Sequence, residues 1–212
     1  MPVNGTRLAF LEQGSGPPIV ALHGAMSDMR AWHAYAPLLS AENRFVAYTQ
    51  RHFGPEHRPA TPGDFSREVH IADLIGFVEA LDAVPVHLLT WSYGGDIATH
   101  AMLRRPDLFR SAVHYEPSVG ALLDRIPGGA DAHAAFAQGF EPALGLMSQG
   151  EAERAAFLFV EAMLGWTPGT AAREPEPFPG CIRDNARTLP AFLQLGPGAD
   201  IADSELEALA TP

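Results

Sequence analysis

A serine between an apolar run and two glycines is the residue of this sequence whose surroundings best suit chemistry. Ser92 comes shortly after the apolar run 86–89 and is followed by Tyr93, Gly94 and Gly95. A sharp turn from a buried strand into a helix lifts a serine hydroxyl clear of the backbone, and small residues must follow because strand and helix approach closely. Such a serine can attack an acyl carbon. The alternative interpretation is an ordinary turn whose serine caps the helix.

A second loop is predicted to face the same place. His23 begins this loop directly after the apolar run 19–22, which has no polar alternation and is typical of a strand buried on both faces. The N–H of Ala25 can therefore meet the N–H of Tyr93 at the carboxyl edge of one sheet. Two such donors stabilise the oxyanion of a tetrahedral intermediate, and losing one costs about 3 kcal/mol. We predict an oxyanion hole made by Ala25 and Tyr93.

The predicted substrate is a small to medium, largely apolar ester or a related acyl compound. Met26 and Trp91 flank the predicted donor and the predicted nucleophile, so we expect their side chains to contact it. Large apolar residues in the second half of the chain agree with such a substrate, although packing between helices explains most of them equally well: Phe136, Phe140, Met147, Phe157, Phe159, Met163, Trp166 and Phe178.

The elements that must position these residues alternate between strand and helix. Strands are predicted at 7–11, 19–22, 45–48, 86–89 and 112–115, and helices from Ser27 or Asp28 to Leu39, after Ser66, and from Tyr93 to just before Pro106. This order implies a parallel sheet with right-handed crossovers. Residues from about 130 to 195 show helical patterns without a strand, at 134–147, 151–164 and 182–195. They predict a helical insertion.

Further motifs complete a resemblance to the α/β-hydrolase superfamily. Residues 50–54 (Gln-Arg-His-Phe-Gly) resemble its Arg-Gly-x-Gly loop, with a histidine in place of the first glycine. Residues 105–109 resemble the turn that leaves the nucleophile helix, and 115–117 resemble the end of its sixth strand. Thr90 replaces the first glycine of the family's G-x-S-x-G turn. Ser92 separates the chain from the dehalogenases and epoxide hydrolases of the family, which use aspartate there.

The resemblance implies an α/β fold with a mostly parallel, doubly wound sheet and an inserted helical cap. It divides the chain into a core at 1–117, a cap at 118–200 and, at 201–212, a lead-in to the remaining part of the core. No cofactor is implied. In the family the acid and the histidine follow the seventh and eighth strands, and we find neither strand in this sequence. We therefore expect a chain truncated before them.

The sequence therefore offers only candidates for the catalytic acid and base. Glu116, directly after the predicted strand 112–115, is the candidate acid, or else it only orients the chain into the cap. His52 and His57, on the loop after the strand 45–48, are the candidate bases, and with Glu56 they would alternatively bind a metal. Losing the histidine of a comparable triad costs roughly 10⁶ in turnover. We expect the isolated chain to be nearly inactive.

Composition limits the partners. The formal net charge of −11 argues against nucleic acid and anionic membranes, and the single Cys181 permits no internal disulfide. No signal peptide or membrane span is recognisable, so we expect a cytoplasmic protein. A truncated sheet would leave one edge exposed, which suits a homodimer. The alternative to an enzyme is therefore an inactive hydrolase fold that binds a ligand or pairs with another chain.

Overall fold

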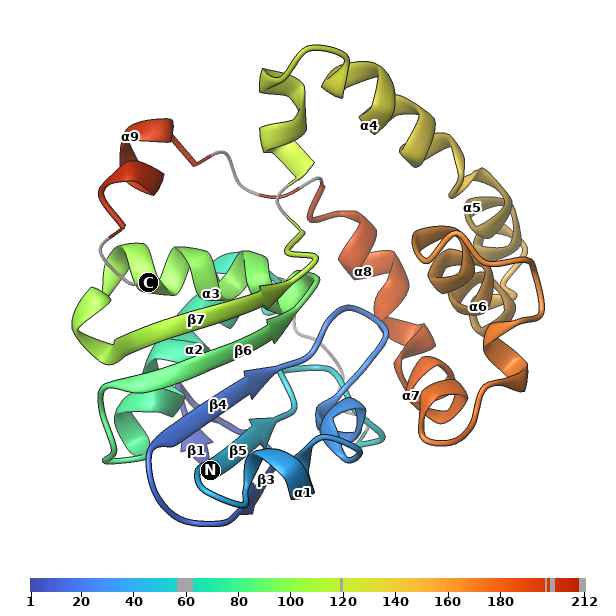
Figure 1. Ribbon diagram of the computed structural model, residues 1–212. Helices are drawn as coiled ribbons and strands as arrows, with labels where there is room; N and C mark the ends of the chain where they lie inside the picture. Colours follow the sequence, from blue (N-terminus) through green and yellow to red (C-terminus); the bar gives the residue numbers. More distant parts are fainter. Residues whose placement is uncertain (57–62, 119, 197, 199–200, 210–212) are drawn as a thin grey trace.

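A five-stranded sheet in the order β3-β5-β4-β6-β7 forms the centre of the protein (Figure 1). The computed structural model describes residues 1–56, 63–118, 120–196, 198 and 201–209. The strands are β3 (Phe10–Gln13), β4 (Pro18–Leu22), β5 (Arg44–Tyr48), β6 (Val86–Trp91) and β7 (Phe109–Tyr115). β3 runs antiparallel to β5, and the remaining pairs are parallel. The mostly parallel sheet expected from the sequence is confirmed.

Helices cover the two faces of this sheet unequally. On one face α2 (Arg67–Ala80) and α3 (Tyr93–Arg104) enclose the larger core, which includes Val20 and Val46. On the other face η1 (Met29–Trp32) and α1 (Ala36–Leu39) pack on a smaller cluster over β4 and β5. Figure 1 shows α1 in front of β5, and α2 and α3 behind β6 and β7. The sheet is therefore doubly wound.

Two predicted elements are shorter than the sequence pattern suggested. The helix expected up to Leu39 is divided in two. The first part is η1, which Asp28 caps, and a turn separates it from the second part, the short helix α1. Pro37 explains the break, because a proline inside a helix lacks the N–H for the helical bond and clashes with the preceding turn. The strand expected at 7–11 is also divided, into β2 (Thr6–Arg7), which pairs with β1 (Pro2–Val3), and the start of β3.

After β7 the described residues form helices and loops. The helices are η3 (Gly120–Arg125), α4 (Gly129–Gln138), α5 (Glu141–Ser148), α6 (Ala152–Met163), η4 (Ala171–Arg173), α7 (Phe178–Asn185), η5 (Ala186–Thr188), α8 (Leu189–Leu193) and α9 (Asp203–Glu207). The single helix expected at 134–147 is divided in two, because α4 ends at Gln138, directly before Gly139. Helices α4–α8 lie beyond the carboxyl ends of the parallel strands (Figure 1). Within the described ranges, no helix is long and apolar enough to cross a lipid bilayer.

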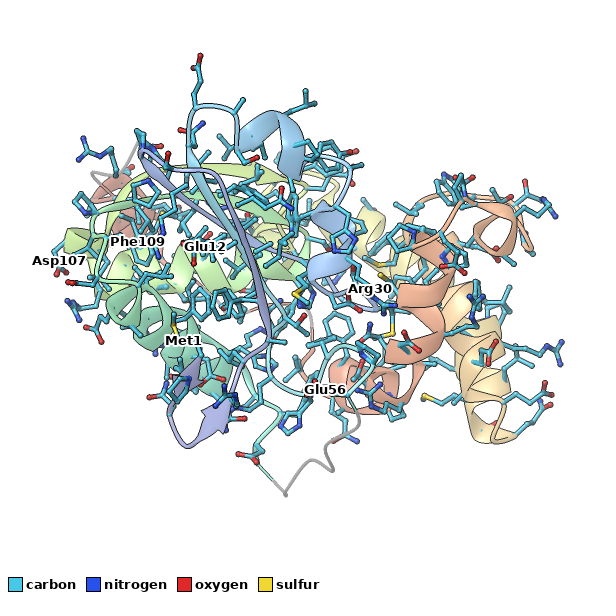
Figure 2. The ribbon with its side chains drawn as sticks, turned by 90° about the horizontal axis from the view of Figure 1, so that it is seen from below. Met1, Glu12, Arg30, Glu56, Asp107 and Phe109 are labelled. Atoms are coloured by element: carbon cyan, nitrogen blue, oxygen red, sulfur yellow. The ribbon has the colours of Figure 1, made fainter. Side chains whose placement is uncertain are left out.

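A buried carboxylate joins helix α7 to the loops of the sheet. Asp28 is 1% exposed and accepts hydrogen bonds from Arg30 Nε (2.8 Å) and Arg30 Nη2 (2.7 Å). Burial acts to raise the pKa of Asp28, but the Arg30 hydrogen bonds outweigh it and hold the pKa below its usual value. In Figure 2, Arg30 is labelled between the sheet and the orange helical region that contains α7.

Asn185, at the end of α7, completes this connection. Its Nδ2 donates to Asp28 Oδ2 (3.2 Å) and to the Cys181 carbonyl (2.8 Å), and its Oδ1 accepts from the Gly54 N–H (2.7 Å). The side chain is fully buried, so each of these groups would otherwise be unpaired. The helical region and two loops at the carboxyl edge of the sheet are thus fixed through one amide.

Replacing Asn185 should therefore loosen both regions together. We expect Asn185→Ala to lower the free energy of unfolding by about 1–3 kcal/mol, because buried polar partners lose their hydrogen bonds. The control is Asn43→Ala, which removes one partly exposed bond to the Leu39 carbonyl and should cost no more than about 0.5 kcal/mol. Urea titrations give both values, and equal midpoints would contradict the assignment.

Candidate active site

The turn between β6 and α3 holds Ser92 in an unusual backbone conformation. Its φ is +50° and its ψ is −117°. A non-glycine residue held in such a conformation costs about 1–3 kcal/mol, so neighbouring groups must hold it there. The Ser92 N–H donates to the Tyr115 carbonyl (3.0 Å), and the Ser92 carbonyl accepts from Gly95 (2.8 Å) and Ser118 (3.1 Å). Both backbone groups are satisfied, and β7 and the chain beyond it fix the turn.

Glycines around this turn permit contacts that a side chain would prevent. A Cβ on Gly94 would lie 2.8 Å from the His23 carbonyl oxygen, and one on Gly95 would lie 2.7 Å from Pro117 Cβ. On the opposite loop, a Cβ on Gly24 would lie 3.1 Å from Ser92 Cβ. The loop after β4 therefore rests directly against the serine, as the sequence predicted for a shared edge.

Thr90, which replaces the first glycine of the family's turn, fits its position in β6 without crowding. It is fully buried, and its Oγ1 lies 2.6 Å from His114 Nδ1. The same oxygen would be 3.3 Å from a Cβ on Gly95, so the bare glycine provides its space. Burial lowers the pKa of His114, which favours the neutral ring as the partner of the hydroxyl.

His23 positions the loop that carries Ala25. The ring is buried, its Nε2 accepts from the Gln50 N–H (3.0 Å), and Nδ1 therefore carries the proton that it donates to the Gly24 carbonyl (2.8 Å). Gln50 Nε2 in turn donates to the His23 carbonyl (2.8 Å). Burial lowers the pKa of His23 to about 4, so the ring is neutral near pH 7. Both ring nitrogens are occupied, which excludes His23 as a base for Ser92.

The predicted oxyanion donors lie on the two segments that meet at the serine. Ala25 follows Gly24, and Tyr93 is the first residue of α3. Neither N–H has a hydrogen-bond partner in the part of the chain that the structure describes. Met26 has a φ of +52° and is 1% exposed within the main core, whereas Trp91 is partly exposed. The substrate contacts expected of Met26 and Trp91 stay predictions.

Within the described ranges, the serine hydroxyl has no hydrogen bond to a candidate base or acid. No histidine nitrogen there hydrogen-bonds Ser92 Oγ. His52 is partly buried and its ring lies 6.0 Å from that of Phe65. His57 lies outside the described residues. Glu116, with a φ of +47°, is exposed at the end of β7, where no hydrogen bond or ion pair of its side chain is found. Among the described residues, no hydrogen bond therefore joins Glu116 or His52 to the serine.

His70 was expected from the sequence to lie on the outer face of its helix, and the structure contradicts this. It is 1% exposed, its Nδ1 lies 2.6 Å from the Tyr93 hydroxyl, and its Nε2 lies 3.2 Å from the Arg51 carbonyl. Burial lowers its pKa to about 3. Leu74, one turn further along α2, is also buried. This i, i+4 spacing was the available signal that His70 lies on the inner face.

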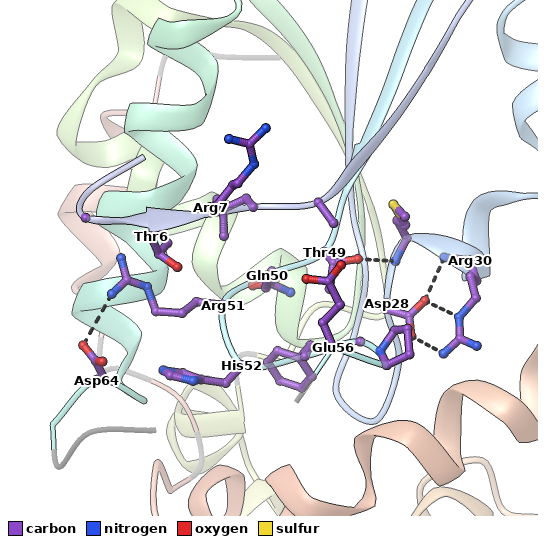
Figure 3. A pocket seen from close by; sticks show the side chains of 17 residues that line it. Thr6, Arg7, Asp28, Arg30, Thr49, Gln50, Arg51, His52, Glu56 and Asp64 are labelled. Atoms are coloured by element: carbon purple, nitrogen blue, oxygen red, sulfur yellow. Dashed lines mark hydrogen bonds and ion pairs between the residues drawn. The ribbon is translucent and has the colours of Figure 1, made fainter. Parts of the chain in front are cut away.

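A pocket of about 260 Å³ is lined by residues that follow β4 and β5 and by residues 5–9 (Figure 3). Its lining includes two ion pairs. Arg30 pairs with Asp28, and Arg51 pairs with Asp64. Ser92 is not part of the lining. This pocket therefore does not provide the apolar acyl site expected from the sequence. In the described part of the chain, no three His, Cys, Asp or Glu side chains are grouped to hold a metal.

Comparison with known proteins identifies the fold family. The sequence-family model described as the alpha/beta hydrolase fold matches residues 17–204, so the chain belongs to this family. An α/β hydrolase from Sphaerobacter thermophilus DSM 20745 superposes with a TM-score of 0.68 at 20% identity, over 97% of this chain and 76% of that one. Epoxide hydrolase VrEH1 from Vigna radiata superposes with a TM-score of 0.51 at 25% identity, over 53% of this chain and 35% of that one.

Curated relatives match by sequence over shorter stretches. Epoxide hydrolase 3 of Siraitia grosvenorii is 28% identical over 143 residues, which are 67% of this chain and 43% of that protein. 2-Hydroxymuconate semialdehyde hydrolase of Pseudomonas sp. (strain CF600) is 30% identical over 112 residues, 51% and 39% respectively. The chain thus spans about two fifths of the length of these relatives.

Adding one methyl group at Gly94 tests the close approach at the serine turn. We expect Gly94→Ala to destabilise the protein by about 1–3 kcal/mol, because the new Cβ meets backbone oxygen that cannot move aside. Gly145→Ala is the matched control, since no atom lies within 4 Å of its Cβ position in α5. It should stabilise by about 0.5–1 kcal/mol. Effects of the same sign in thermal or urea unfolding would refute this.

The buried, neutral His70 should make stability depend on pH. Its folded pKa of about 3 lies below the unfolded value of about 6.5, so the unfolded chain takes up a proton that the folded chain refuses. Stability is then lost as pH falls below about 6.5, at about 1.4 kcal/mol per pH unit. His70→Gln should remove this one-proton contribution of about 1.4 kcal/mol per pH unit from the slope. Ile71→Val should lower the free energy of unfolding without changing the slope. Urea unfolding from pH 4 to 7 measures both slopes; identical slopes would rule the assignment out.

Proposed function

We propose that Ser92 is the nucleophile of a serine hydrolase that acts through an acyl-enzyme. The proposed substrate is a small to medium, largely apolar ester or a related acyl compound. The observation that carries this is the backbone of Ser92, held at φ +50° between a buried strand and a helix N-terminus. A protein retains such strain at a serine when the exposed hydroxyl is useful.

The proposed reaction uses groups from both segments of the site. Ser92 Oγ attacks the acyl carbon and gives its proton to a base, while the N–H groups of Ala25 and Tyr93 hold the oxyanion. The alcohol leaves with a proton, and water then releases the acid from Ser92. In this proposal the base comes from outside the described residues, where His57 is the candidate that the sequence offers.

The relatives support a hydrolase without fixing its substrate. Their names specify an epoxide for one and a semialdehyde for the other. Ser92 favours a carbonyl substrate over an epoxide, because an acyl carbon passes through an oxyanion that two N–H groups can stabilise.

A second candidate function follows from the Ser92 hydroxyl, which has no hydrogen-bond partner in the part of the chain that the structure describes. Without a base, serine is a weak nucleophile at neutral pH. The fold would then serve to bind a ligand or another chain. The two candidates differ in whether Ser92 can be activated, and that difference is measurable.

An aryl ester assay with added base separates the two candidates. We expect p-nitrophenyl butyrate to be hydrolysed slowly by the 212-residue chain and at background rate by Ser92→Ala. Ser15→Ala, which changes an exposed turn serine, is the matched control and should keep the full rate. Imidazole should raise the Ser92-dependent part of the rate, because it can accept the proton of the Ser92 hydroxyl.

The Ser92→Ala rate at each imidazole concentration is subtracted, since imidazole also attacks the ester directly. A Ser92-dependent rate that rises at least tenfold supports the hydrolase. Equal rates in the two proteins at every imidazole concentration would favour the inactive fold and refute the acyl-enzyme.

A further inference from the structure

Another pocket, of about 340 Å³, lies in the helical region that follows the sheet. It is a crevice between α6 and the segment that joins α6 to α7, and the described residues that line it fall between Leu146 and Arg183. Figure 1 shows this segment on the side of α6 away from the sheet. The pocket shares no residue with the chemistry proposed for Ser92, so it is a separate site.

A buried carboxylate lines this pocket. Glu161 is 2% exposed, and its Oε1 accepts a hydrogen bond from the Ala171 N–H (2.9 Å) at the start of η4. Its other oxygen, Oε2, has no hydrogen-bond or ion-pair partner among the described residues, yet it is not sealed from solvent. Arg154, Leu158 and Glu161 follow the i, i+4, i+7 spacing of one helix face, and all three line the pocket. Oε2 therefore opens into the pocket.

The walls beside this carboxylate are apolar. Leu146 lies near the end of α5, and Phe157 and Leu158 lie on the turn of α6 that precedes Glu161. All three side chains pack against the main core and remain partly exposed. A buried carboxylate without a charged partner is costly, so a ligand that brings positive charge stabilises it. The aromatic face of Phe157 also attracts cations.

The charges around the pocket favour a cation over an anion. Arg154 lines the pocket but already pairs with Glu151, which does not line it. Arg183 likewise pairs with Glu176. Glu153 lines the pocket, is exposed, and has no ion-pair partner in the described part of the chain. With the buried carboxylate, these side chains carry two positive and four negative charges, a net charge of −2.

We propose that this pocket binds a small organic cation, with its ammonium group at Glu161 and its apolar body against Leu146, Phe157 and Leu158. The ammonium N–H donates to Oε2, while Oε1 keeps its hydrogen bond to Ala171. The volume of about 340 Å³ lies within the usual range of small-molecule sites, which combine apolar walls with a few fixed polar groups. A metal ion fits less well, because no three ligating side chains are grouped among the described residues.

Titration with 2-phenylethylammonium chloride at pH 7 tests this site. This ion joins an ammonium group to a phenyl ring, and its binding to the full 212-residue chain is followed by ¹H–¹⁵N NMR. We expect a saturable shift of the Ala171 amide signal, with a dissociation constant of about 1 mM or lower. 2-Phenylethanol has nearly the same shape without the charge. It should bind about tenfold more weakly or worse, because hydrogen bonds between charged groups are stronger than neutral ones.

Replacing the carboxylate separates its charge from its structural role. Glu161→Gln keeps an oxygen for the Ala171 N–H but removes the charge, and should weaken binding of the ammonium ion about tenfold or more. Glu141→Gln is the matched control, since this exposed carboxylate of α5 does not line the pocket. It should leave the dissociation constant within about twofold, because solvent and salt screen its charge. Ala172→Trp fills the pocket from an exposed position and should abolish binding.

Three results would each overturn the proposal: no saturable shift in the original chain, equal binding of the alcohol and the ammonium ion, or equal binding by Glu161→Gln. If Glu161→Gln does not fold, the alcohol and Ala172→Trp decide, and undiminished binding by Ala172→Trp would place the ion elsewhere. None of these measurements depends on whether Ser92 is catalytic.

Discussion

A serine held at φ +50° is unfavourable in isolation, so the structure around Ser92 has to hold it there. Hydrogen bonds reach the turn from β7 and from the segment after it, while Gly94 lets the end of β4 touch the start of α3. These contacts also bring the loop of Gly24 against the serine. The order of β4, β6 and β7 in the sheet is therefore what brings the turn of Ser92 and the loop of Gly24 to one place.

The loops behind this place are fixed by buried polar groups that stay in one protonation state. The neutral ring of His23 connects the loop after β4 to Gln50, and the neutral ring of His70 connects Tyr93 to Arg51. Asp28 and Asn185 extend the same network to the helices that follow the sheet. Burial lowers the pKa of both rings, so neither carries charge near pH 7 and neither competes as a base. Their role is to keep the candidate site rigid.

Local patterns were enough to predict the sheet and the serine turn. The buried runs, Gly94-Gly95 and the loop after β4 lie where the sequence placed them, because each depends on neighbours close in the chain. The burial of His70 and the division of the helix before Leu39 were missed, since they depend on packing partners and on one proline. The sequence offered His52 and His57 as bases for Ser92, but His52 has no hydrogen bond to the serine among the described residues, and His57 lies outside them.

Covalent labelling of the serine tests the central claim most directly. The folded chain is treated with an alkyl fluorophosphonate, whose adduct is not hydrolysed, and is then digested and analysed by tandem mass spectrometry. The account predicts a single adduct on Ser92, which disappears when the chain is first unfolded in urea, because the turn exposes and orients the hydroxyl. No adduct on Ser92, or equal labelling of folded and unfolded chain, would contradict it.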